Sequence, residues 1–444
     1  MSRFLIATVP LIGHVNPGLP IARALLHKGH EVWWYSGKKF QTRIEATGAR
    51  FVPMTAAYDY DDFDLDLAFP GRTNLGDFAQ LKFDLKHIFT DPAPGQVQDL
   101  ETVLSEFSPD VFLGDAAFMG IPLLCERHGI CFATFSTTVL GMKSRDTAPF
   151  GLCMMPSSSA LGHLRNRALY WLFDTFLFRD VEAYYKDIRA KLSLSMDGYR
   201  PFFESSLGPY LYLHGTVPGF EYPRRDLPRQ VHFTGPFLPP PAPDFLPPAW
   251  WNELQSGRPV IHVTQGTVAT NPNQLLIPAL RALAEEDVLV IAVASGQLSG
   301  AIGPLPANAR LESFIPHSQL LPRVDVMITN AGFGGTQMAL AHGIPLIAAA
   351  GTDDKPEIAS RIACSGAGIN LHTKTPSPEQ IRKAVHEILT NASYRIQAQK
   401  LQAEMARYDM PTRTVMLLEQ LAQTKKPVVN LPGAIPYASA TASG

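Results

Sequence analysis

Short apolar runs alternate with helix-like segments along most of this chain. The first example is an apolar run at Phe4–Val9, a loop at Pro10–Asn16, a helical pattern at Pro17–Lys28 and a second apolar run at Val32–Tyr35. Two apolar runs joined through a helix indicate parallel strands, because a parallel pair needs a long crossover connection. The chain is therefore expected to form an α/β fold.

Local signals place the ends of the first helix. Asn16 is a favourable N-cap, and Pro17 suits the first helical position because its missing N–H has no intrahelical partner there. Gly29 suits the left-handed residue that follows a helix. Further strands are expected at Val111–Gly114 and Cys131–Ser136.

The same rhythm begins again after a proline-rich stretch at residues 231–250. Apolar runs recur at Val260–Thr264, Val288–Ala294 and Val324–Thr329, and a chain of 444 residues is too long for one hydrophobic core. We predict two facing, Rossmann-like, doubly wound α/β domains. Their expected bounds are an N-terminal domain at 1–230, a linker at 231–250, a C-terminal domain at 251–405, a helix at 406–426 that packs back on the N-terminal domain, and a tail at 427–444.

Charge and cysteine content exclude several classes of protein. The 38 Lys and Arg residues against 40 Asp and Glu give a net charge of −2, so no basic field is available for nucleic acid. No apolar stretch approaches the ~18 residues that a membrane span needs, and the N-terminal run is too short for a signal peptide. The four cysteines show no metal-ligand spacing. We expect a cytoplasmic protein with reduced thiols and no metal site.

Two loops at the carboxyl ends of strands carry residues suited to chemistry, because ligands of open α/β sheets bind there. In the first loop, the His14 imidazole precedes the predicted helix and is suited to accept a proton from a hydroxyl. Asp115, directly after the strand at Val111–Gly114, is the candidate to hold the other ring nitrogen. The same pattern also fits a packing or capping role for His14 and a capping role for Asp115.

The second loop, Ala331–Thr336, places glycines before a predicted helix. Bare glycines let backbone N–H groups approach an anion, and the helix dipole favours the negative charge of a diphosphate. The spacing fits neither the P-loop nor the dinucleotide fingerprint. A tight corner between strand and helix would use the same glycines.

Together these residues resemble the inverting GT-B glycosyltransferases of the UDP-glycosyltransferase superfamily, particularly bacterial macrolide and natural-product glucosyltransferases. The resemblance covers nearly the whole chain. It implies that His14 is the catalytic base and that Asp115 orients it. The motifs that carry it are Gly13-His14-Val15-Asn16-Pro17, Phe314-Ile315-Pro316-His317, Thr329–Leu340, Gly343-Ile344-Pro345 and Asp353-Asp354-Lys355.

The resemblance also implies how the donor is held. Phe314 takes the place of the aromatic residue that stacks on the base, Ile315 supplies backbone contacts, and His317 replaces a glutamine. The loop glycines wrap the diphosphate together with the turn after the first strand of the C-terminal domain. The donor-binding residues assigned in this way are Gly13, Gln265, Gly266, Thr267, Phe314, Ile315, His317, Asn330, Gly332, Gly334, Gly335, Thr336, Gln337, Asp354 and Lys355.

Two departures from the family pattern concern the nucleotide contacts. Asn330 stands where relatives have a diphosphate-contacting histidine, and Met338 where they have the glutamate that holds the ribose hydroxyls. Asn330 still offers a neutral hydrogen bond, and Gln337 is a candidate for the ribose. The sugar-contacting pair of an acidic residue and glutamine is Asp354-Lys355 here; Lys355 has the alternatives of contacting phosphate or pointing into solvent.

The predicted function is metal-independent, inverting transfer of a hexose, expected to be glucose from UDP-glucose, to a hydroxyl of a small hydrophobic or aromatic acceptor. A natural product, phenol, flavonoid or macrolide would fit. No cofactor is expected, because the nucleotide sugar is a substrate. The acceptor is expected to contact Tyr58–Phe89 and Thr137–Tyr185.

Three other functions remain open at this point: a non-catalytic protein that binds a small molecule or nucleotide sugar, a TDP-deoxysugar transferase, and a sugar-nucleotide epimerase. Neither nucleic acid nor integral membrane association is expected. The chain could be a monomer or a homodimer.

Overall fold

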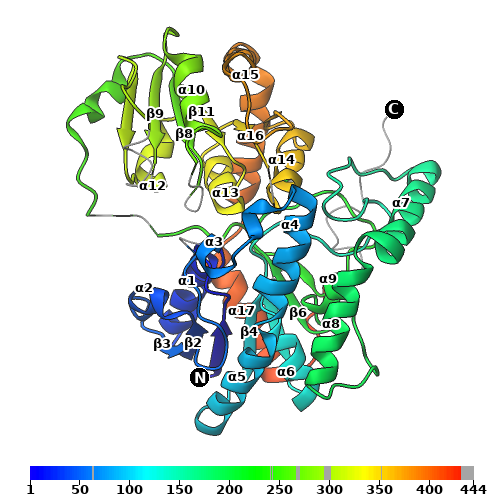
Figure 1. Ribbon diagram of the computed structural model, residues 1–444. Coiled ribbons are helices and arrows are strands. Elements are labelled where there is room, and N and C mark those ends of the chain that lie inside the picture. The colour runs from blue at the N-terminus through cyan, green and yellow to red at the C-terminus, as the bar shows by residue number, and fades with distance from the viewer. Residues whose placement is uncertain are drawn as a thin grey trace. The chain divides into compact units, whose positions relative to one another are not determined.

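The computed structural model describes residues 1–62, 65–240, 242, 244–266, 271–294, 302–351 and 353–431. The chain divides into two compact units. The first unit holds residues 1–218, 222–239 and the described residues from Tyr408 on, and the second holds 219–221 and 240–407. Figure 1 shows the blue and cyan elements of the first unit and the yellow and orange elements of the second.

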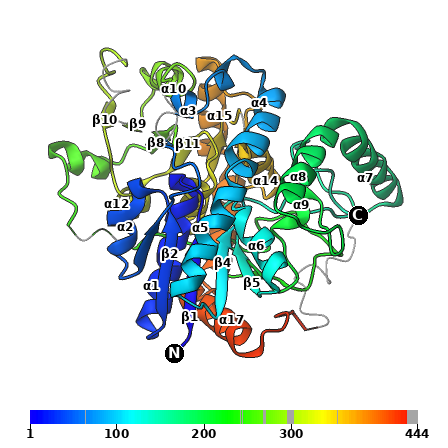
Figure 2. The same ribbon diagram turned by 60° about the horizontal axis from the view of Figure 1, so that its bottom comes forward.

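The first unit is built on a seven-stranded sheet in the order β3-β2-β1-β4-β5-β6-β7. Every neighbouring pair is parallel, and Figure 2 shows β2, β1, β4 and β5 side by side. The strands are β1 Arg3–Ala7, β2 Glu31–Ser36, β3 Arg50–Pro53, β4 Val111–Asp115, β5 Phe132–Phe135, β6 Leu211–His214 and β7 Val231–Phe233. The expected parallel α/β architecture is confirmed.

Helices cover both faces of this sheet. Their bounds are α1 Ile12–His27, α2 Gln41–Glu45, α3 Leu65–Ala68, α4 Asp77–Phe83, α5 Ala93–Glu106, α6 Gly120–His128, α7 Ala160–Leu172, α8 Arg179–Lys191, α9 Phe202–Ser205 and α17 Met410–Thr424, with shorter turns η1 Lys38–Phe40, η2 Arg72–Asn74, η3 Asp84–Thr90 and η4 Phe173–Leu177. One core cluster joins α1, α2 and α17 to one face. A second joins α5, α6 and α8 to the other face. Both faces are buried, as a parallel sheet requires.

The first helix begins earlier than the sequence predicted. Helix α1 starts at Ile12 rather than Pro17, so Pro17 lies inside it and His14 lies in its first turn rather than before it. The reason is a long-range cap: the Ile12 N–H donates to the buried Asp62 carboxylate at 2.6 Å. Asn16, the predicted N-cap, instead accepts a hydrogen bond from Arg43 at 2.8 Å. Gly29 does adopt the expected left-handed conformation, with φ of 80°.

The second unit repeats the architecture with six parallel strands in the order β10-β9-β8-β11-β12-β13. The strands are β8 Val260–Thr264, β9 Leu289–Val293, β10 Ala309–Glu312, β11 Val326–Thr329, β12 Leu346–Ala348 and β13 Gly368–Asn370. The helices are α10 Leu276–Leu283, α12 His317–Leu320, α13 Phe333–Ala341, α14 Lys355–Cys364, α15 Pro378–Thr390 and α16 Ala392–Met405, with turns η5 Ala249–Gln255 and η6 Leu321–Arg323. Helices α10 and α15 share one core cluster with the sheet.

A buried ion triad ties a short segment of chain into the second unit. The Arg361 guanidinium is 1% exposed and donates to Glu221 and, at 2.9 Å, to Glu357 on its own helix α14. Glu221 belongs to the short segment 219–221, which interrupts the first unit in sequence. Losing one partner of such a triad would leave buried charge uncompensated, so the contact fixes the path of the chain at that point.

Among the described residues, none of the helices combines the length and the apolar composition of a membrane span.

Candidate functional site

Each sheet reverses its strand order at one place, and the predicted site residues lie at both of these places. In the first sheet the reversal falls between β1 and β4, and in the second between β8 and β11. His14 follows β1 and Asp115 ends β4; Gln265 follows β8 and Asn330 follows β11. Such reversal points leave a crevice at the carboxyl ends of the strands, where ligands of open α/β sheets bind.

The His14 imidazole and the Asp115 carboxylate are hydrogen-bonded. Their Nδ1 and Oδ1 atoms lie 2.9 Å apart, and the Asp115 side chain is buried while that of His14 is 18% exposed. A carboxylate only accepts hydrogen bonds, so the proton of the ring sits on Nδ1. The other nitrogen, Nε2, makes no hydrogen bond with a described residue. This arrangement fixes the tautomer of the ring and leaves the lone pair of Nε2 able to accept a proton.

Asp115 is held in turn by the backbone. Its oxygens accept the N–H groups of Val9 and Ala117, each at 2.8 Å. Asp115 does not cap α6, because the N-cap of that helix is Met119 and no side chain caps it. The Ala117 N–H that Asp115 accepts belongs to the turn between β4 and α6. The same carboxylate serves both the turn and the imidazole.

Two further residues lie beside His14. The Thr137 hydroxyl lies 3.3 Å from His14 Nδ1, and the Phe89 ring lies 6.0 Å from the imidazole between centroids. Both residues stand at the ends of the ranges expected to contact the acceptor, Tyr58–Phe89 and Thr137–Tyr185. The sequence did not indicate that these two residues in particular adjoin His14: Thr137 follows β5, next to β4 in the sheet, and Phe89 comes from η3.

Tyr60 packs near these residues in a hydrophobic cluster with Phe69 and Ile88, against which Phe89 also packs. Burial, and then the charge of Asp115, raise the pKa of Tyr60 well above its ordinary value. The Tyr60 hydroxyl is buried and has no hydrogen-bond partner within the described part of the chain.

In the second unit a side-chain bond links the two loops at the reversal point. The Asn330 amide donates to the Gln265 backbone carbonyl, and the Gln265 side chain caps the start of α10 by accepting the N–H groups of Leu275 and Leu276. Gly266 has φ of 78°, and a Cβ there would lie 3.3 Å from the Asn330 amide. Glycine is therefore required for the turn. Thr267 lies outside the described residues.

The predicted anion loop is the first turn of α13. Helix α13 starts at Phe333 with Gly332 as N-cap, so Gly334 and Gly335 lie inside the helix rather than before it. Their N–H groups belong to the set that no helical carbonyl satisfies. A Cβ on Gly334 would meet nothing within 4 Å, whereas the Thr336 side chain is buried. The open face of this turn is thus lined by backbone rather than side chains.

Left-handed residues occur in all three loops that follow β8, β11 and β12. Besides Gly266, they are Ala331 with φ of 64° and Asp353 with φ of 63°. For a residue with a side chain this conformation costs ~1–2 kcal/mol. Strain of this kind gathers at binding loops, where the surrounding structure fixes the backbone for its function.

The remaining donor residues are placed as follows. Phe314, after β10, is 73% exposed, and Ile315 is buried. Gln337 is buried on α13, and Asp354 is the N-cap of α14. Lys355 forms an ion pair with Asp353 at 2.6 Å, so the chain itself supplies an anion for this lysine. Gly13 lies in the first turn of α1, where a Cβ would meet nothing within 4 Å.

His317 has a neighbour that the sequence did not indicate. Its Nε2 lies 3.3 Å from Nε2 of His262, a fully buried residue of β8 whose Nδ1 donates to the Ile291 carbonyl at 3.0 Å. Burial, and then the charge of His317, lower the pKa of His262 to about 3. Burial, and then His342, lower the pKa of His317 to about 4. The pair is uncharged near neutral pH.

Comparisons with known proteins identify the family of this chain. Residues 277–421 match the family described as erythromycin biosynthesis protein CIII-like, C-terminal domain. The chain is 46% identical over 420 residues to 4'-demethylrebeccamycin synthase of Lentzea aerocolonigenes, covering 95% of this chain and 99% of that protein. It is 31% identical over 414 residues to UDP-glucosyltransferase A1 of Starmerella bombicola, covering 89% and 87%.

This protein is a glycosyltransferase of the UDP-glycosyltransferase superfamily. The solved structure of CalG4, the calicheamicin glycosyltransferase, shares its fold with a TM-score of 0.72 at 20% identity, over 96% of this chain and 100% of that one. The glycosyltransferase of kitacinnamycin gives a TM-score of 0.71 at 22% identity, over 94% and 98%. The predicted GT-B fold and the natural-product type of glycosyltransferase are confirmed.

The His262–His317 pair should make the stability of this glycosyltransferase sensitive to acid. Both histidines titrate near pH 6.5 when unfolded but stay neutral far below that when folded, so stability is complete above pH 6.5 and is lost as the pH falls below it. As the pH falls from 6.5 to 5, each histidine becomes protonated in the unfolded chain but stays neutral in the folded one. Each should therefore lower the free energy of unfolding by ~2 kcal/mol over this range. His317→Gln should reduce the fall in melting temperature between pH 7.5 and pH 5. The control is His386→Gln, which replaces an exposed histidine. If the melting temperatures of the two variants fell equally between pH 7.5 and pH 5, this account would be contradicted.

Proposed function

We propose that the protein transfers a hexose from a uridine diphosphate sugar to a hydroxyl of a small hydrophobic acceptor, with inversion at the anomeric carbon. The observation that carries the proposal is the His14–Asp115 pair at the reversal point of the first sheet. It supplies a base with a fixed tautomer and a reachable nitrogen. A hydroxyl nucleophile needs such a base, because it is weak until its proton is removed.

In the proposed reaction, His14 Nε2 takes the proton of the acceptor hydroxyl as its oxygen attacks the anomeric carbon. The bond between that carbon and the diphosphate oxygen breaks in the same step, and the leaving diphosphate keeps the electron pair. Asp115 stabilises the imidazolium through its bond to Nδ1. A single displacement from the opposite face gives the inverted product.

The first turn of α13 is proposed to bind the leaving diphosphate. The N–H groups of Gly334 and Gly335 make no hydrogen bond with a described residue, and the positive end of the helix dipole lies there. Donors of this kind stabilise the charge that develops on the leaving group. Phe314, exposed after β10, is proposed to stack on the base of the nucleotide.

The acceptor is proposed to be an apolar or aromatic natural product bound near His14. Support comes from the hydrophobic cluster of Tyr60, Phe69 and Ile88, together with Phe89 beside the imidazole. The name of the relative 4'-demethylrebeccamycin synthase also places that protein in natural-product synthesis.

His14→Ala should lower the rate of transfer by ~10²–10⁴, because the acceptor hydroxyl then loses its base. Binding of UDP should be nearly unchanged, since His14 belongs to the other unit. His27→Ala, an exposed histidine on the same helix α1, is the control. Asp115→Asn should be similarly damaging because it can no longer stabilise the imidazolium. Turnover of His14→Ala within a few-fold of wild type would exclude His14 as the base.

Metal independence is part of the proposal. Within the described residues, no group of three or more His, Cys, Asp or Glu side chains is arranged to hold a metal ion. The α13 N-terminus is proposed to neutralise the diphosphate instead. Transfer should therefore persist in excess EDTA, measured as product formed by mass spectrometry. Complete loss that Mg²⁺ or Mn²⁺ restores would overturn this part of the mechanism.

The donor is proposed to be UDP-glucose, with weak discrimination against TDP-glucose. Met338, partly buried on α13, replaces the carboxylate that relatives use for the ribose hydroxyls, a hydrogen bond typically worth ~1.5–3 kcal/mol. A site that never pairs the 2′-hydroxyl has little with which to reject a nucleotide that lacks it. This reasoning also accommodates the TDP-deoxysugar alternative.

The ratio of kcat/KM for UDP-glucose over TDP-glucose tests this account of the donor. It should be below ~10³ in wild type and should rise in Met338→Glu. A thymidine donor has no 2′-hydroxyl to donate a hydrogen bond to the new carboxylate, whereas a uridine donor has one. Met338→Leu is the control and should keep the wild-type ratio. A wild-type ratio above ~10³ would show that another group, such as Gln337, already reads the ribose.

A further inference from the structure

A surface pocket with a volume of about 640 Å³ lies on the first unit, beside helix α7. Its walls come from α7, from the loop that follows β5 and from the segment between β6 and β7. The described residues to which His14 makes hydrogen bonds or ring contacts, Asp115, Thr137 and Phe89, are not among its lining residues. The residues that matter for its chemistry are Lys143, Arg145, Leu164, Arg167, Tyr170 and Asp226.

The residues that line this pocket carry more positive than negative charge. The two oxygens of Asp226 accept hydrogen bonds from the Ser144 hydroxyl at 2.6 Å and the Arg145 N–H at 2.8 Å. Lys143 is paired with Asp174 at 2.7 Å. The exposed guanidinium groups of Arg145 and Arg167, in contrast, form neither an ion pair nor a hydrogen bond with any described residue. These two guanidinium groups are therefore available to bind an external anion.

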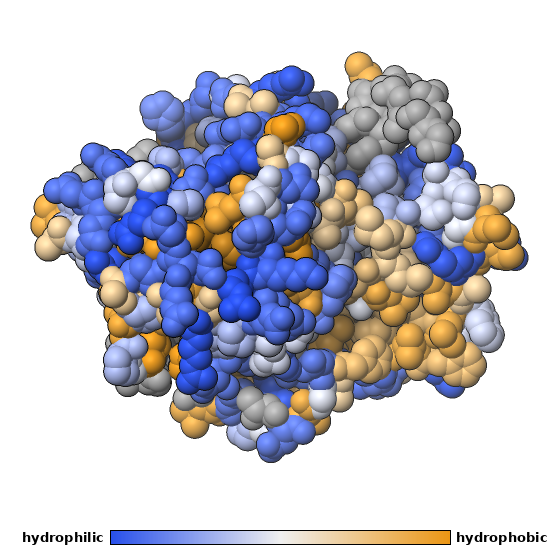
Figure 3. Space-filling model, turned by 90° about the horizontal axis from the view of Figure 1, so that it is seen from above, coloured by the Kyte–Doolittle hydropathy of each residue, from blue (hydrophilic) through white to orange (hydrophobic). Residues whose placement is uncertain are grey.

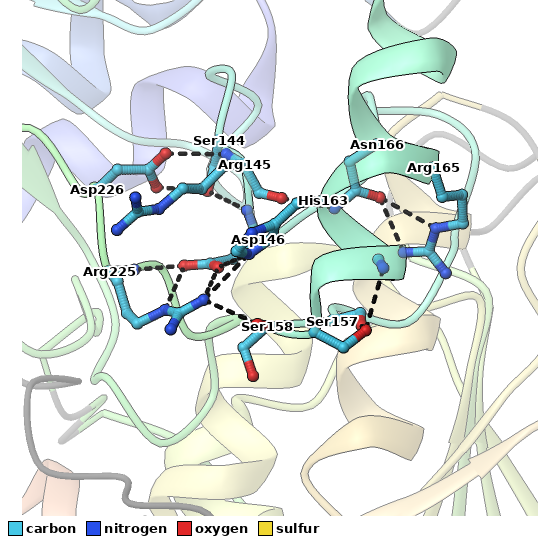
Figure 4. A network of polar contacts seen from close by, with 12 residues as sticks. Ser144, Arg145, Asp146, Ser157, Ser158, His163, Arg165, Asn166, Arg225 and Asp226 are labelled. Carbon is cyan, nitrogen blue, oxygen red and sulfur yellow. Dashed lines mark hydrogen bonds and ion pairs between the residues drawn. The ribbon is translucent and has the colours of Figure 1, made fainter.

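A buried polar network holds the wall that carries Arg145 (Figure 4). Next to it, Asp146 accepts hydrogen bonds from Arg225 at 2.7 Å and 2.8 Å and contacts His163 at 2.9 Å. Burial alone would raise the pKa of Asp146, but these hydrogen bonds lower it to about 2. The fully buried Asn166 donates from α7 to the Arg145 carbonyl at 2.8 Å. The backbone of Arg145 is thus fixed before any ligand arrives, which reduces the entropic cost of binding.

Apolar side chains lie on α7, the helix that also carries Arg167. Leu164 is 61% exposed at the pocket, and the Tyr170 ring lines it. Leu161 and Trp171 leave further apolar surface on α7, being 81% and 62% exposed. Figure 3 shows hydrophobic residues gathered on one side of the face it draws. A ligand that reached only the guanidinium groups would leave this surface in water.

We propose that this pocket binds a small organic anion, with its carboxylate or a similar oxyanion on Arg145 and Arg167 and its apolar body against Leu164 and Tyr170. The site is additional to the one around His14. A planar oxyanion matches the guanidinium fork, and an aromatic body matches the tyrosine ring. The volume suits a small molecule rather than a macromolecule.

Calorimetric titration of the full-length protein with indole-3-acetate tests the proposal, with indole-3-acetamide as the uncharged probe of the same shape. The acid should bind at least ~10-fold more tightly than the amide. Arg145→Ala and Arg167→Ala should each weaken binding of the acid by ~10-fold, a figure at the low end for a charged hydrogen bond because both groups are exposed. Leu164→Ser should weaken the binding of indole-3-acetate and of indole-3-acetamide to the same extent.

The matched control is Arg179→Ala, which removes an exposed arginine of α8 that does not line the pocket. Its affinity for indole-3-acetate should equal that of wild type. All of the substituted side chains are exposed, so the variants should fold, and unchanged circular dichroism confirms it. Equal binding of acid and amide, or equal affinities in Arg145→Ala, Arg167→Ala and Arg179→Ala, would overturn the proposal. Inorganic phosphate binding as tightly as the acid would also overturn it, because the apolar body would then contribute nothing.

Discussion

One buried carboxylate organises the reactive edge of the first unit. Asp115 accepts hydrogen bonds from Val9 after β1, from Ala117 before α6 and from the His14 ring in the first turn of α1. A buried carboxylate is costly unless its oxygens are satisfied, and here the backbone satisfies much of that requirement independently of the histidine. The position of the imidazole therefore depends on a carboxylate that the sheet itself fixes.

In the second unit, the loops at the reversal point are held together by neutral groups. At its reversal point Asn330 donates to the Gln265 carbonyl, and Gln265 in turn caps α10. An amide at this place holds two loops together without adding charge beside the first turn of α13. That turn presents backbone N–H groups, and the neighbouring residues Asn330 and Met338 are both uncharged. In the proposed donor site, main-chain donors would therefore contribute more to anion binding than side chains.

Much of this arrangement was predictable from local patterns. Apolar runs of strand length, the glycines at Gly29 and Gly266 and the polar residues directly after strands indicated both sheets and the edge at which chemistry would lie. His14 and Asp115 could be paired as candidates because the carboxyl ends of parallel strands share one edge. The helix starts could not be predicted in the same way. The cap of α1 is Asp62, fifty residues along the chain, so the local signal at Asn16 and Pro17 was outweighed by a tertiary contact.

The fold class, the family and the candidate loops could be read from the chain alone, since periodicity and motif order are local properties. The folded structure was needed to show which groups meet: Thr137 and Phe89 with His14, His262 with His317, and Glu221 with Arg361. It was also needed to show that the guanidinium groups of Arg145 and Arg167 have no ion-pair partner among the described residues. Hydrogen bonds, desolvation and charge pairing depend on distances across the fold, and residues far apart in sequence set those distances.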